Sequence, residues 1–171
     1  MNVTDRLTAL AISQPDAAAI QAVDGVLSFA ELDHVVSATA KAFQDAGIST
    51  GDVVAIALPD EMVHMITSLG LARLGAGQVV IRALDALETR EAVLQSLPVS
   101  ATVTVTNETA NSVVGASVIA PPPGTLSELR AMPNITFAAA DDPDLPLFYP
   151  RSSGTTARPK LGRLTHKKMF V

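Results

Sequence analysis

The sequence predicts an α/β fold of three layers, in which a mostly parallel sheet carries helices on both faces. Strand-like and helix-like segments alternate along most of the 171 residues, as they do when crossover helices join parallel strands. The strand-like segments are short and apolar without strict alternation, which is typical of a sheet buried on both faces. The chain is long enough for one domain or one large subdomain with its own core.

The first elements are expected to be a short helix and a β-hairpin. A helix over residues 4–13 would have Thr4 as its cap and an apolar face. Residues 17–23 have the composition of a strand, and Asp24-Gly25 is a hairpin signal that leads into the next apolar residues.

A longer helix is expected to follow the hairpin. Ser28 and Glu31 have the spacing of a capping box, in which each side chain binds a free backbone N–H of the first turn. The apolar residues after them recur at helical spacing, and Gly47 is a suitable residue for ending the helix.

The rest of the chain continues the alternation. We expect a strand at 53–58, a helix capped by Asp60 and ended by Gly75 and Gly77, a strand at 79–81, a weaker helix at 87–97, strands at 101–106 and 113–120, a helical turn at 127–132, and a strand at 147–149. The last strand runs into a glycine-hydroxyl segment, which is placed at the edge where open α/β sheets bind ligands.

Composition limits the possible functions. The net charge of −5 argues against a surface that binds nucleic acid. The chain has no cysteine, which excludes disulfides and zinc–thiolate sites. Charged Asp5 and Arg6 precede any apolar run, so no secretory signal is expected and a cytoplasmic location follows.

The chain is apolar for a soluble monomer. Hydrophobic residues make up 48%, charged residues 17%, and the mean hydropathy is +0.33. No run reaches the roughly 18 apolar residues of a membrane span. We therefore expect an exposed apolar face that packs against the remainder of a longer chain or against a second copy in a homo-oligomer.

The most informative stretch lies at residues 149–166, YPRSSGTTARPKLGRLTH. We call residues 152–160 the phosphate segment. Hydroxyl groups, a glycine amide and a lysine ammonium in one short segment suit a polyphosphate, here the phosphates of ATP. The candidate binding residues are Ser152, Ser153, Gly154, Thr155, Thr156 and Lys160. The alternative is an ordinary turn-rich surface segment, and the Walker pattern is not met because Pro159 precedes Lys160.

The segment SSGTTARPK, with the downstream Leu164-Thr165-His166, resembles the phosphate-loop signature of the adenylate-forming enzymes, which include acyl-CoA synthetases and the adenylation domains of nonribosomal peptide synthetases. Residues 27–81 resemble the opening region of the same family in order and spacing. The resemblance covers only the N-terminal portion of such enzymes, so residues 1–171 are expected to be a subdomain that ends just after the phosphate segment.

The resemblance implies that the intact enzyme activates a carboxylic acid with Mg-ATP as acyl-AMP, and that a thiol such as coenzyme A then accepts the acyl group. The rest of the ligase chain is then a partner, and no catalytic residue or metal site is expected within these residues. A stand-alone binding or assembly module and an unrelated nucleotide-binding α/β protein are the alternatives.

Three residues depart from the family pattern. Ala157 and Leu161 stand where glycine is usual, and Arg151 is unusual ahead of the serines. His166 belongs to the pattern, and structural and catalytic roles for it both remain open. His34 and His64 have no partner ligands in the sequence and are expected to have ordinary surface or core roles, while Asp141, Asp142 and Asp144 are expected to form a solvated acidic loop.

Overall fold

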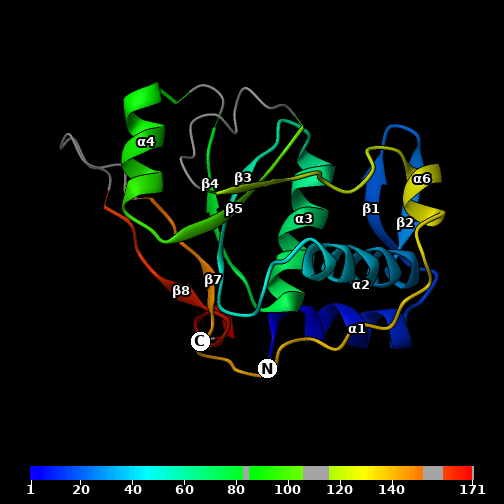
Figure 1. The fold of residues 1–171 in the computed structure, drawn as a ribbon. Coiled ribbons are helices and arrows are strands. Elements are labelled where there is room, and N and C mark those ends of the chain that lie inside the picture. The colour runs from blue at the N-terminus through cyan, green and yellow to red at the C-terminus, as the bar shows by residue number, and fades with distance from the viewer. Residues whose placement is uncertain (83–84, 106–115, 152–159, 171) are drawn as a thin grey trace.

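The computed structural model describes residues 1–82, 85–105, 116–151 and 160–170. Its centre is a sheet of six strands in the order β6-β5-β3-β4-β7-β8 (Figure 1). The strands are β3 (Val53–Ala57), β4 (Gly77–Val80), β5 (Val99–Thr104), β6 (Ser117–Ile119), β7 (Pro146–Phe148) and β8 (Leu164–Thr165). Every pair is parallel except β7 with β8, which confirms the predicted mostly parallel sheet.

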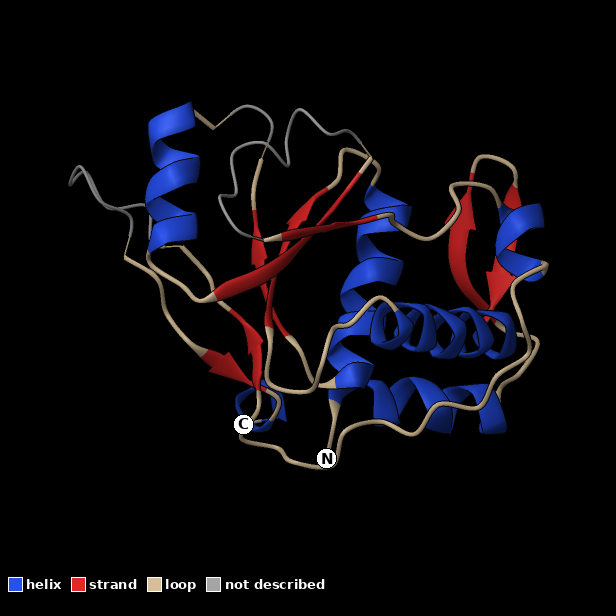
Figure 2. Ribbon diagram, in the orientation of Figure 1, coloured by secondary structure: helices blue, strands red, loops and turns tan. Residues whose placement is uncertain are grey.

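Helices cover both faces of this sheet (Figure 2). Successive residues of a strand point to opposite faces, and β3 shows this directly. Val54 and Ile56 pack with Leu71 of α3 (Glu61–Leu74) and with Phe43 of α2 (Phe29–Asp45). Ala55 and Ala57 pack with Val93 and Leu94 of α4 (Leu87–Gln95) on the other side. The predicted three layers are thus present.

The predicted hairpin forms a separate sheet beside α2. Strands β1 (Ala18–Ala22) and β2 (Gly25–Ser28) pair antiparallel across the Asp24-Gly25 turn. A third apolar cluster joins the hairpin to α1 (Val3–Ser13), α2 and α6 (Leu126–Arg130), with Leu27 and Leu129 fully buried. The Asp24 carboxylate accepts a hydrogen bond from the backbone N–H of Leu126 at 2.9 Å, which fixes α6 on the turn.

Local capping signals were mostly sufficient to locate the helix ends. Ser28 and Glu31 form the predicted capping box of α2, and Asp60 caps α3. Gly75 has a φ of 84°, the left-handed conformation that glycine adopts without strain. The prediction that Thr4 caps the first helix is wrong, because the Asn2 side chain accepts a hydrogen bond from the backbone N–H of Thr4, so the cap lies two residues earlier and α1 begins at Val3.

One predicted strand falls partly outside the described residues. The predicted strand at 113–120 is seen only as β6, since residues 106–115 lie outside the described ranges. A short 3-10 helix, η1 (Lys167–Phe170), follows β8. Within the described part of the chain, no helix is long and apolar enough to cross a membrane.

Candidate functional site

The phosphate segment follows β7 in the chain, after three intervening residues. Ser152, Ser153, Gly154, Thr155 and Thr156, as well as Ala157, lie outside the described residues. Lys160, the last residue of the segment, is described and exposed. No ion pair among the described residues involves Lys160. The structure therefore defines how the segment is attached to the sheet.

Strand β7 is attached to β4 through a fully buried glutamine. The carbonyl of Gln78 accepts the backbone N–H of Tyr149 at 2.8 Å. The side-chain amide of Gln78 donates to the carbonyl of Ser68 at 2.8 Å and accepts the Ser68 hydroxyl at 2.5 Å. A side chain on Gly77 would meet the ring of Tyr149 at 2.9 Å, so glycine allows the tyrosine to pack on the sheet. These contacts hold Tyr149, just after β7, beside β4 and α3.

The chain leaves and re-enters the segment side by side. Arg151 and Leu161 form an isolated antiparallel β-bridge, and the backbone N–H of Gly162 donates to the carbonyl of Pro150 at 2.9 Å. We call residues 150–151 and 161–162 the stem of the phosphate segment. Leu161 is half-buried against the apolar cluster on the α4 face of the sheet. Because Lys160 directly precedes Leu161, its backbone is attached to the end of the stem.

The stem also carries an ion pair that the sequence reading missed. The guanidinium of Arg151 meets the carboxylate of Asp85 through Nη1–Oδ2 at 2.9 Å and Nη2–Oδ1 at 3.1 Å. This two-bond geometry is the strongest form of a carboxylate–guanidinium contact. Burial alone would raise the pKa of Asp85, but the hydrogen bonds from Arg151 and from the backbone N–H of Arg82 lower the pKa overall. Asp85 is therefore an anion that holds the first residue before the segment.

His166 is fully buried just beyond β8. Its Nδ1 accepts the backbone N–H of Val3 at 3.1 Å, and its Nε2 has no hydrogen-bond partner among the described residues. Burial lowers its pKa, and the nearby N-terminal ammonium lowers it further. His166 thus links the strand that follows the phosphate segment to the start of α1. Of the structural and catalytic roles considered for His166, this contact supports the structural one.

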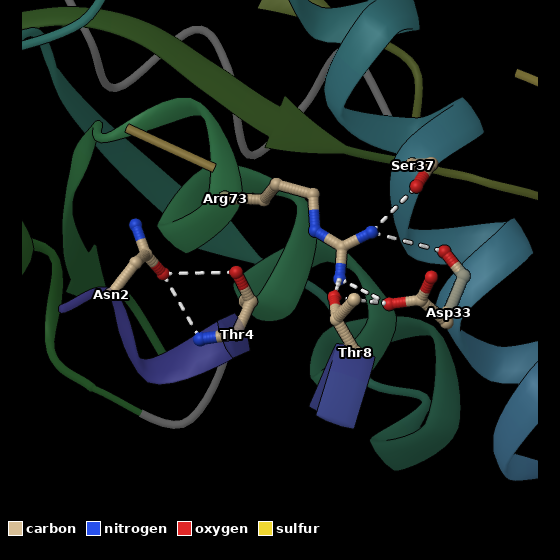
Figure 3. Close-up of polar contacts among 6 residues, drawn as sticks. All are labelled: Asn2, Thr4, Thr8, Asp33, Ser37 and Arg73. Carbon is tan, nitrogen blue, oxygen red and sulfur yellow. Dashed lines mark hydrogen bonds and ion pairs between the residues drawn. The ribbon is translucent and has the colours of Figure 1, made fainter. Parts of the chain in front are cut away.

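A second buried polar cluster ties the three helices of one face together (Figure 3). Arg73 at the end of α3 donates to the Ser37 hydroxyl, to the backbone and carboxylate of Asp33, and to the Thr8 hydroxyl. Beside it, the Asn2 amide donates to the carbonyl of Ala72 at 2.7 Å. No motif in the sequence indicates this cluster, because its members are far apart along the chain. It supports the fold and lies away from the stem.

One groove opens at the start of α3 and has a volume of about 330 Å³. Leu58, Pro59, His64 and Met65 are among its lining residues. Burial lowers the pKa of His64, although a backbone hydrogen bond with Leu58 opposes this. No group of three or more residues able to ligate a metal gathers anywhere in the described ranges. The groove is mostly apolar, and Glu61, His64 and Ser68 are its polar lining residues.

Comparison with known proteins gives a consistent result. The profile of the family described as AMP-binding enzyme matches residues 8–171. Phenyloxazoline synthase MbtB of Mycolicibacterium paratuberculosis is 32% identical over 162 residues, which are 95% of this chain and 14% of that protein. Nonribosomal peptide synthetase GRA1 of Gibberella zeae is 31% identical over 104 residues, 61% of this chain and 1% of that protein. The chain thus spans only a small part of these relatives.

Solved structures show the same fold. The N-terminal subdomain of Klebsiella oxytoca NpsA, in complex with 3-hydroxybenzoyl-AMSN, superposes with a TM-score of 0.79 at 20% identity, over 97% of this chain and 41% of that one. The likeness confirms the predicted fold class. The extent of the profile match shows that the chain belongs to the AMP-binding enzyme family, of which it represents the N-terminal part.

Proposed function

We propose that this chain supplies the ATP-phosphate site of a ligase that activates a carboxylic acid as its acyl-adenylate. The observation that carries the proposal is the stem. It begins at the carboxyl end of β7 and ends beside an exposed Lys160 that has no carboxylate partner among the described residues. A sequence rich in hydroxyl donors joins its two sides, at the sheet edge where α/β proteins bind ligands.

Each polar residue of the segment has a defined role in this proposal. Ser152, Ser153, Thr155 and Thr156 donate hydroxyl hydrogen bonds to the β- and γ-phosphates, and Gly154 lets the backbone approach them closely. Lys160 adds a positive charge. Mg²⁺ prefers oxygen ligands, and hydroxyl groups provide them, so the residues of the segment suit a nucleotide that binds as Mg-ATP.

The chemistry follows from this charge distribution. A carboxylate oxygen of the acid attacks the α-phosphorus of ATP, the bond to the β-phosphate oxygen breaks, and pyrophosphate leaves with the electron pair. The acid is already ionised at neutral pH, so no general base is required for the attack. The segment contributes by positioning the phosphates and by stabilising the charge that develops on pyrophosphate.

The acyl acceptor in the second step is a thiol. Nonribosomal peptide synthetases occur among the relatives, which favours the thiol of a carrier protein over coenzyme A, our first expectation from the sequence. The residues that select the acid and the acceptor are proposed to lie in the remainder of the ligase. A stand-alone module that binds polyphosphate without catalysis is the second candidate, and the same binding site would serve it.

The test is polyphosphate binding by the purified chain. Tyr149 is the only tyrosine and there is no tryptophan, so tyrosine fluorescence reports on the start of the stem during titration with tripolyphosphate. Calorimetry with Mg-ATP provides a second measurement. Lys160→Ala and Thr155→Ala should each weaken binding about tenfold, the value of one charge-assisted hydrogen bond.

Lys168→Ala is the matched control, because Lys168 is exposed on η1 and its loss changes the net charge equally. Equal affinities for Lys160→Ala and Lys168→Ala, or no binding by the unchanged chain, would refute the proposal. Pyrophosphate release over a panel of carboxylic acids separates the two candidates once the remainder of the ligase is added, since only the ligase requires the acid for turnover.

A further inference from the structure

The stem of the phosphate segment is held to the sheet on both sides by side chains of different chemistry. Arg151 on the outgoing side is bound by Asp85, which follows β4. Leu161 on the returning side packs against the apolar cluster of Ala55, Val79 and Val93. The β-bridge between Arg151 and Leu161 joins the two sides. Neither anchor uses a residue of the phosphate segment itself.

Asp85 is itself oriented before it meets Arg151. Its carboxylate accepts the backbone N–H of Arg82 at 3.2 Å, and its own N–H donates to the carbonyl of Arg82 at 3.1 Å. The two side chains of the pair are only 17% and 22% exposed, so water screens the pair less than it screens a surface pair. A carboxylate fixed by its own turn and bound through two hydrogen bonds defines the direction of the guanidinium.

The anchor affects binding because groups that are disordered in the free protein lose conformational entropy when they bind an anion, and this loss weakens the affinity. Fixing both ends of a short segment reduces the number of conformations open to the residues between them. Less conformational entropy is then lost on binding phosphate, which increases affinity without a new contact to the ligand.

We propose that Asp85 is a positioning residue for polyphosphate binding, because its ion pair with Arg151 fixes the stem from which the phosphate segment extends. This inference rests on the proposed phosphate-binding function. In the competing arrangement, Arg151 is itself a phosphate ligand and Asp85 occupies it in the free protein. The two arrangements predict opposite effects of removing the Asp85 charge.

The experiment compares Asp85→Asn, Arg151→Gln and the double variant with Glu91→Gln. Glu91 is exposed on α4, so its replacement reproduces the change in net charge without touching the stem. Relative to Glu91→Gln, Asp85→Asn should weaken tripolyphosphate binding about fivefold, as expected for a partly buried ion pair. The double variant should lose little more than either single variant, because both remove one interaction.

A second readout follows the stem directly. The amide of Gly162 is hydrogen-bonded to the carbonyl of Pro150, and its hydrogen exchange by NMR reports opening of the stem. Asp85→Asn should accelerate this exchange severalfold, while the denaturation midpoint of the chain changes little. A general structural defect would instead move the midpoint and the exchange of core amides together.

The outcomes separate clearly. Tripolyphosphate affinity of Asp85→Asn equal to that of Glu91→Gln would overturn the inference. Tighter binding by Asp85→Asn, together with weaker binding by Arg151→Gln, would also overturn it and identify Arg151 as a phosphate ligand. No binding by the unchanged chain would refute the proposed function and with it the purpose of the anchor, whereas the exchange of Gly162 would still decide whether Asp85 holds the stem.

Discussion

Replacing Asp33 with asparagine should destabilise the chain more than replacing Arg73 with methionine, although the two residues form one ion pair. The reason is the unequal burial of the partners, because the side chain of Arg73 is 2% exposed and that of Asp33 is 23% exposed. In Figure 3 the guanidinium lies between α1 and α2, where Ser37, Asp33 and Thr8 surround it. Asp33 lies at the edge of this cluster, where water can reach it.

The magnitudes follow from what each change leaves behind. Asp33→Asn keeps an oxygen acceptor at 2.5 Å from Nη2 but leaves a buried guanidinium without a counter-charge. An uncompensated buried charge costs about 3–5 kcal/mol, and the partial exposure of Asp33 favours about 3 kcal/mol. Arg73→Met keeps the apolar stem of the side chain and leaves a carboxylate that water and the Thr8 hydroxyl can still solvate. Its cost is about 2 kcal/mol, mainly from lost hydrogen bonds.

Urea denaturation followed by circular dichroism measures both free energies of unfolding. Asp45→Asn and Lys41→Met, which alter the exposed i,i+4 pair on α2, are matched controls and should each change stability by less than about 0.5 kcal/mol. The double variant of Asp33 and Arg73 should cost less than the sum of the single variants. A larger cost for Arg73→Met than for Asp33→Asn, or costs near those of the controls, would refute the reasoning from burial.

Three further predictions concern other parts of the chain. The free energy of unfolding should fall as the pH drops below about 6.5. The pKa of His166 is lowered in the folded state, so the unfolded chain takes up the proton first as the pH falls. In urea denaturation at a series of pH values, His166→Gln should reduce this pH dependence without abolishing it, since burial also lowers the pKa of His64. Leu161→Gly should cost about 1–2 kcal/mol and weaken tripolyphosphate binding, because a half-buried apolar contact and backbone rigidity are lost together. The chain should self-associate, as its apolar composition predicts, and light scattering over a concentration series that finds only monomer would contradict this.

The elements that were predicted correctly depend on residues close together in the sequence. The Asp24-Gly25 hairpin and the Ser28–Glu31 capping box need only a few neighbouring residues, so local chemistry determines them. Asp85 and Arg151 are 66 positions apart, and no periodicity or motif connects them. Such pairs become visible only when the parallel sheet brings the ends of β4 and β7 together.

The capping error at Thr4 has the same origin. Threonine and asparagine are both good cap residues, and the sequence-based prediction named Thr4. Asn2 is preferred because its side-chain amide also reaches the carbonyls of Ala72 and Ala140. Tertiary contacts therefore selected between two locally acceptable caps. Within the candidate site, Lys160 and the stem are described, and the assignment of Ser152 to Thr156 remains a prediction.

The departures from the family pattern on either side of the segment have a common physical explanation. Arg151 and Leu161 are bonded to each other through the β-bridge, and both side chains contact the body of the sheet. Glycine at position 161 would leave the returning side of the stem held by backbone hydrogen bonds alone, with a more flexible chain. In this chain a leucine side chain and an ion pair supply that restraint. Arg151 and Leu161 are thus expected to be interdependent, and replacing Leu161 by glycine should increase the dependence of polyphosphate binding on Asp85.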